Sequence, residues 1–307
     1  NAYAEPASPA LLPLDLMRKL KLNGQLNISS LLLPNNLNLQ QFSTNIHANQ
    51  GQWRIQPLTA RLFQGDLQAG LTLNAALADP QWQIQTNFSQ IDVQALTQAL
   101  IKLTRFQLSG QGNVNADLTL RGNSLDALKQ SLSGSVNLNV AKGILHGVDI
   151  LYYASLAEAL ANKQAPTRSD TKQTAFNKLS ASVQIQNGLA NNQDLIMQAP
   201  LLEVNGKGSA NLITQQIAYQ LAIQRMTSGS IAKPRGPALP LKITGPFSNP
   251  NISVDWKILV STQLQDQLQQ QLEKFAPKEN NLLKEAIDSG KVSKTIQQGL
   301  QSLLGGS

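Results

Sequence analysis

Apolar and polar side chains alternate along much of this chain, and that alternation constrains the fold more than any other feature. In residues 81–88, Trp82, Ile84 and Phe88 fall on one parity, while glutamines and an asparagine fall on the other. Successive side chains of a β-strand point to opposite faces, so the pattern predicts a strand with one apolar and one polar face. Similar segments recur about a dozen times between residues 22 and 256. One-sided strands of this kind are typical of an antiparallel sheet.

The polar positions are filled mainly by amides. The chain has 36 glutamines and 26 asparagines, whereas only 14% of its residues are charged, against about a quarter in typical domains. The formal net charge is +7. The lysines and arginines are nevertheless scattered without interleaved aromatic residues, which argues against nucleic acid as a partner. A hydrophobic content of 41% excludes a disordered chain.

Helices are expected at a few places only. Residues 91–103 repeat valine and leucine at helical spacing and predict an amphipathic helix. Ser124 and Asp149 are each placed to cap a further short helix. After Trp256 the apolar period becomes helical again, so the chain is expected to end in amphipathic helices.

These signals predict one long β-domain flanked by two tails. Residues 1–10 are expected to form a flexible tail and residues 11–256 the β-domain, with exposed loops at about 163–172 and 228–237. Residues 257–307 form the predicted helical tail.

The helical tail carries candidate contacts with a membrane or a partner protein. They comprise three leucines on one helix face and three lysines further on: Leu264, Leu268, Leu272, Lys284, Lys291 and Lys294. The alternative is that the leucine faces of the tail pack on the end of the sheet or on each other.

Residues with catalytic or metal-binding potential are scarce. The chain has no cysteine and two histidines, His47 and His146. His47 is interpreted as an exposed strand residue, and His146 as a turn residue next to a helix cap. An acid–base pair of His146 with Asp149 is the less favoured alternative. We therefore expect no enzymatic activity, no cofactor and no metal site.

The apolar face of a one-sided sheet must be covered by helices, by a second sheet or by a ligand. The periodicity alone favours a sandwich in which the sheet folds over on itself. The alternative is a curled sheet with an apolar channel that takes lipid acyl chains. In that case the candidate lining residues are Leu71, Leu73, Trp82, Ile84, Phe88, Val114, Leu118, Leu120, Val136, Leu138, Val183, Ile185, Ile217, Tyr219, Leu221, Ile223, Leu241 and Ile243.

Several segments resemble the AsmA family of bacterial envelope proteins. Residues 108–125 and 132–150 resemble its alternating strands, and Gly143, Gly147 and Asp149 match its Gly-x-x-x-Gly-x-Asp pattern before a helix. Residues 239–252 resemble the closing segment of the family, in which a Gly-Pro turn separates the final strands. The resemblance implies a mainly β chain with a few helices (α+β): an elongated, curled antiparallel sheet that forms an apolar groove, with short capping helices.

The resemblance also implies a location and a function. The chain is expected to be the C-terminal, periplasmic part of a longer protein, anchored in the inner membrane by an N-terminal helix that is missing here. The implied partner is phospholipid, whose acyl chains lie in the groove and are carried toward the outer membrane in support of its lipid homeostasis. The C-terminal helices are expected to contact the outer membrane or an envelope protein. The alternative function is a scaffold or assembly factor for outer-membrane proteins.

Overall fold

The fold is described from a computed structural model, which describes residues 9–33, 37–100, 107–152, 154–155, 171–228 and 232–254. Most of the predicted N-terminal tail and of the loop at 163–172 lies outside the described residues. So does the whole predicted helical tail, with its candidate residues Leu264, Leu268, Leu272, Lys284, Lys291 and Lys294.

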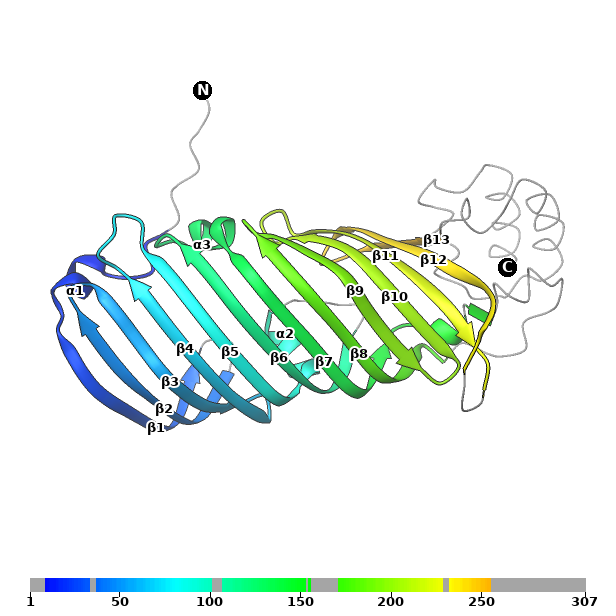
Figure 1. The fold of residues 1–307 in the computed structure, drawn as a ribbon, viewed down its shortest axis with the longest axis horizontal. Coiled ribbons are helices and arrows are strands. Elements are labelled where there is room, and N and C mark those ends of the chain that lie inside the picture. The colour runs from blue at the N-terminus through cyan, green and yellow to red at the C-terminus, as the bar shows by residue number, and fades with distance from the viewer. Residues whose placement is uncertain are drawn as a thin grey trace, which may run out of the picture.

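The described chain forms one antiparallel sheet of 13 strands whose order in the sheet is their order in the sequence (Figure 1). The strands are β1 (Leu22–Leu33), β2 (Leu37–Asn49), β3 (Gln52–Leu62), β4 (Gly65–Asn74), β5 (Gln81–Asp92), β6 (Gln107–Arg121), β7 (Ser133–His146), β8 (Gln173–Gln186), β9 (Leu189–Ala199), β10 (Leu202–Asn211), β11 (Gln216–Met226), β12 (Pro234–Pro246) and β13 (Asn251–Val254). β12 begins inside the loop expected at 228–237. β13 pairs with β12 and not with β1, so the sheet is not closed.

The sandwich favoured by the periodicity is wrong for the described residues, because they form one unclosed sheet whose strands contact chiefly their sequence neighbours. The strands are long and bent, and the sheet curls around the side on which α2 (Val93–Leu100) lies (Figure 1). Bending coincides with shifts of register. Gln41, Gln90 and Lys142 have positive φ and lie at such shifts. A bulge of this kind adds one residue to one strand and increases its bend.

Tight turns with positive φ angles connect neighbouring strands. Asn187 and Gly188 both have positive φ and connect β8 to β9, as a tight hairpin requires. The β3–β4 turn instead places its positive φ angles at Phe63 and Gln64. Pro57 lies inside β3, at a register shift between Ile55 and Leu58.

Within the described residues, four short helical segments lie at the ends or on one face of the sheet. They are α1 (Leu14–Lys19), α2, α3 (Leu125–Ser131) and the helical residues among 150–155. The Ser124 hydroxyl accepts a hydrogen bond from the backbone N–H of Ala127 at 3.2 Å, which confirms its predicted capping role. α1 was not expected from the sequence. It is held by Trp53, whose Nε1–H donates to the carbonyl of Met17 at 3.2 Å.

In the part of the chain that the structure describes, buried apolar side chains form two separate clusters on the same face as α2. The smaller cluster lies under β2–β4 and is centred on Leu39, Ala60 and Leu67. The larger lies under β6–β12, and its buried members are Val93, Val140, Ile150, Tyr152, Ala154, Phe176, Leu179, Met197, Leu202, Val204, Ile223 and Leu239. The second cluster therefore joins α2 and the segment 150–154 to the sheet.

Candidate functional site

The strand registers align nine apolar side chains and three glycines into a row across the sheet. Each residue of this row, which we call the apolar row, pairs with the next on the neighbouring strand. From β1 to β12 its members are Gly24, Ile46, Ile55, Leu71, Ile84, Leu118, Gly134, Ile185, Ala190, Ala210, Ile217 and Gly245. None has a polar side chain. At a strand spacing of about 4.8 Å, the row extends over roughly 50 Å.

The apolar row is only partly covered. Leu71, Ile84, Leu118, Ile185 and Ile217 are all half-buried, and none of them belongs to either buried cluster. The registers place the predicted lining residues on the face of this row, and only Leu73 and Ile223 among them are buried, at 4% and 1% exposure. A sandwich core would bury such side chains nearly completely. The face therefore retains apolar surface that no described element encloses.

One part of the apolar face is covered by a short segment of the chain itself. Ile150, Tyr152 and Ala154 pack into the larger cluster. The buried Asp149 carboxylate begins this segment. It accepts hydrogen bonds from the backbone N–H of Tyr152 at 2.8 Å and from the hydroxyl of Thr171 at 2.7 Å. These bonds confirm the predicted cap at Asp149 and fix the segment against the sheet.

A polar pair, Asn192 of β9 and Tyr219 of β11, lies beside the apolar row. Asn192 replaces an apolar residue at a bulge of β9 and is only 6% exposed. Its amide oxygen accepts a hydrogen bond from the Tyr219 hydroxyl, and its Nδ2 donates to the carbonyl of Ser182 at 2.8 Å. Burial, with a further contribution from the charge of Asp194, raises the pKa of Tyr219 to about 12. The lining is therefore apolar but not uniform, since it contains this satisfied polar pair.

The two histidines lie apart from this face and from each other. His47 is exposed in β2, on the polar parity that the sequence predicted. His146 ends β7, where its Nε2 lies 3.0 Å from the Ser109 hydroxyl. The Asp149 carboxylate accepts the hydrogen bonds given above and one more from the backbone N–H of Thr171 at 3.2 Å, so its described geometry is that of a helix cap.

Among the described residues, no group of three or more His, Asp or Glu side chains comes together in a way that could hold a metal ion. Within the same residues, no helix has both the length and the apolar character needed to cross a membrane.

Comparison with known proteins assigns a family. The sequence profile of the AsmA family matches residues 11–195, which is more than half of the chain. The chain belongs to the AsmA family. It is similar to Protein AsmA of Escherichia coli (strain K12), with 20% identity over 246 residues. No solved structure matches the chain.

The alignment with the Escherichia coli relative covers 78% of this AsmA-family chain and 40% of the relative. The chain therefore spans well under half of the length of the protein it matches. The profile match includes β1–β8 and reaches into β9, so the family assignment applies to the strands that carry most of the apolar row.

Proposed function

We propose that this AsmA-family chain carries phospholipid along the apolar face of its sheet. Family membership points to a role in the cell envelope. The observation that supports the finer proposal is the apolar row, which crosses twelve strands without a polar side chain and whose leucines and isoleucines are half-buried. An enzyme or a compact sandwich has no need of such a row, whereas an acyl chain requires a long apolar surface.

The physical mechanism follows from the absence of charged side chains along this row. Acyl chains lie against it while the headgroup remains in water at the open margin of the curled sheet. Burial of an acyl methylene is worth about 0.8 kcal/mol, so a few methylenes retain a lipid. Each position along the row is isoleucine, leucine, alanine or glycine, so none offers a polar side chain that would hold the lipid there. Because no charged anchor holds the lipid at one place, it slides between positions of nearly equal free energy.

The location and the direction of transport form part of the same proposal. The chain acts in the bacterial periplasm as part of a longer protein anchored in the inner membrane, and delivers phospholipid toward the outer membrane. We expect the C-terminal residues 257–307 to contact the outer membrane or an envelope protein.

The first test is mass spectrometry of lipids extracted from the protein after purification from bacterial cells. We expect phospholipid in near-stoichiometric amount. A second measurement follows fluorescent phospholipid between donor and acceptor vesicles, which the chain should accelerate. A well-folded protein with no bound lipid and no transfer activity would contradict the proposal. A stable complex with outer-membrane proteins in such a lipid-free preparation would instead support the scaffold alternative.

A further inference from the structure

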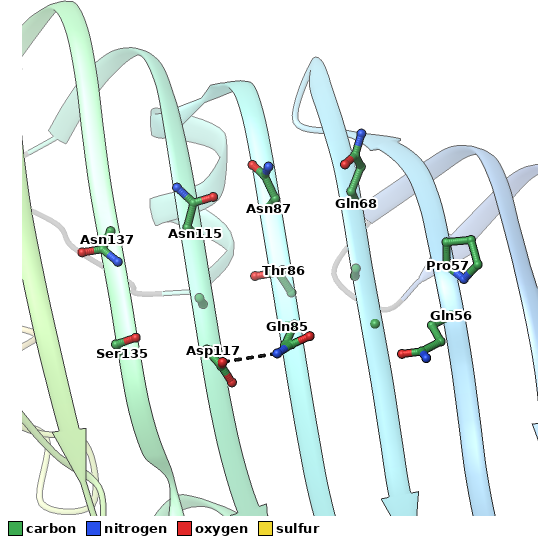
Figure 2. A pocket seen from close by; sticks show the side chains of 13 residues that line it. Gln56, Pro57, Gln68, Gln85, Thr86, Asn87, Asn115, Asp117, Ser135 and Asn137 are labelled. Atoms are coloured by element: carbon green, nitrogen blue, oxygen red, sulfur yellow. Dashed lines mark hydrogen bonds between the residues drawn. The ribbon is translucent and has the colours of Figure 1, made fainter.

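The opposite, polar face of the sheet carries a shallow hollow of about 690 Å³ over β3–β7 (Figure 2). Figure 2 shows the amide side chains of Gln68, Asn87, Asn115 and Asn137 on this face, from four successive strands. α2, which packs on the apolar face, lies behind the strands in this view. The hollow and the apolar row are therefore on opposite sides of the same strands.

Four of the lining amides form an ordered row. Gln68 pairs with Asn87, Asn87 with Asn115, and Asn115 with Asn137 on neighbouring strands. Neighbouring strands are about 4.8 Å apart, so the row offers a side-chain amide at each such step. A primary amide has two donor hydrogens and one acceptor oxygen. The row can therefore bind a ligand that repeats donors and acceptors along its length.

Most of this hydrogen-bonding capacity is unused. Within the described residues, Gln68, Asn115 and Asn137 form no side-chain hydrogen bond. The Asn87 oxygen accepts a long bond of 3.4 Å from the Ser89 hydroxyl, and Gln85 Nε2 donates to Asp117 at 3.3 Å. The amides thus do not form a ladder that would satisfy them internally, and water or a ligand must do so.

The floor of the hollow is shaped by a residue without a side chain. Gly70 lies on β4, where an added Cβ would come within 3.2 Å of the Gln56 side-chain oxygen. Gln56 and Pro57 border the hollow at the register shift of β3. A larger side chain at position 70 would fill this space.

The charge of the lining restricts the ligand class. It contains no lysine, arginine or histidine and one carboxylate, Asp117, so phosphate and sulfate groups find no positive partner. Extended peptides are usually recognised by pockets for alternate side chains, and this shallow polar surface has none. Neutral sugars present alternating hydroxyl donors and acceptors, which match the amide row. We propose that the hollow binds an uncharged glycan strand, which lies across β4–β7 along Gln68, Asn87, Asn115 and Asn137.

The test measures binding of soluble probes by calorimetry and by saturation-transfer NMR. The probes are two neutral tetrasaccharides, one of β-1,4-linked N-acetylglucosamine and one of glucose, and a sulfated oligosaccharide of similar length. We expect saturable binding of at least one neutral probe and much weaker binding of the sulfated one. The double variant Asn115→Val/Asn137→Val should weaken neutral-probe binding by about tenfold or more, because two amides lose their hydrogen bonds.

Two further variants keep the test independent of folding. Asn139→Val/Gln184→Val removes two exposed amides of the same face that lie outside the hollow, and it should leave binding unchanged. Gly70→Leu should abolish binding by filling the floor. Absence of saturable binding of both neutral probes, equal binding of the sulfated probe, or equal effects of the two double variants would overturn the inference. Lipid content should be unaffected in Asn115→Val/Asn137→Val, so the result is separable from the proposal for the apolar face.

Discussion

Replacement of Leu118 by glutamate separates an open apolar face from an enclosed core. Leu118 lies in the middle of the apolar row, between Ile84 of β5 and Gly134 of β7. It is half-buried and belongs to neither buried cluster. In the lipid-free protein the new carboxylate can stay hydrated. The variant then loses about half of the transfer free energy of a leucine, which is about 1 kcal/mol, against a typical folding stability of about 5–15 kcal/mol.

The effect on bound lipid is expected to be larger. If the hydrated carboxylate keeps about three methylenes of a passing acyl chain off the row, the loss at ~0.8 kcal/mol per methylene is about 2.4 kcal/mol. This corresponds to about fifty-fold weaker retention. The assay compares phospholipid per protein by mass spectrometry and vesicle-to-vesicle transfer, with urea denaturation as the measure of stability.

Two control variants complete this experiment. Thr119→Glu places the same charge on the exposed, polar side of the same strand and should retain lipid. Val140→Glu places it at a position that is 1% exposed and should unfold the domain. The reasoning is refuted if Leu118→Glu retains as much lipid as the unaltered chain, if Thr119→Glu loses as much, or if Leu118→Glu unfolds like Val140→Glu.

Three further predictions concern stability. Asp149→Ala should lower the free energy of unfolding, measured by urea denaturation, by about 2–3 kcal/mol, because a helix cap and buried hydrogen bonds are lost. Ser124→Ala removes a half-buried cap and should lower it by about 1 kcal/mol. Gly143→Ala should lower the free energy of unfolding by about 2 kcal/mol, since the new methyl overlaps the Phe176 ring and the Ser109 carbonyl. The control Gly24→Ala, whose added Cβ would meet no atom within 4 Å, should change stability by less than about 0.5 kcal/mol. Equal effects of the two variants would contradict the packing around Gly143. The pKa of Tyr219 is about 12 in the folded chain and 10.0 in its ordinary state, so the unfolded chain loses this proton first. The free energy of unfolding should therefore fall as pH rises from 10 to 12. Denaturation curves of Tyr219→Phe should show a smaller fall over that range, and an identical fall would exclude Tyr219 as its source.

The strands were predictable because period 2 is a local property of the sequence. The parity of Trp82, Ile84 and Phe88, the turn at Asn187-Gly188 and the caps at Ser124 and Asp149 all depend on neighbouring residues, and the structure has each of them. β9 was not recognised from its alternation, because the bulge near Asn192 shifts its register against β8 and breaks the period.

The apolar row could not be predicted in the same way. Its continuity depends on register, and a shift of one residue would move a strand's apolar side chains to the other face. The register is set by bulges at residues such as Gln41 and Lys142, whose positive φ angles have no signal in composition. The choice between a sandwich and one curled sheet also depends on bends that accumulate over many strands. Resemblance to the AsmA family, and not the periodicity, indicated the curled sheet.

Because the strands follow one another in sequence order, the sheet resembles a linear array of repeated units. Its strands contact chiefly the strands before and after them in the chain, as neighbouring units do in repeat proteins, whose stability is approximately a sum over adjacent pairs. Insertion or removal of one hairpin would therefore change the span by two strand spacings, about 10 Å, and leave the other contacts in place. The length of the sheet can thus be adjusted in discrete steps during evolution, most simply outside the larger buried cluster under β6–β12.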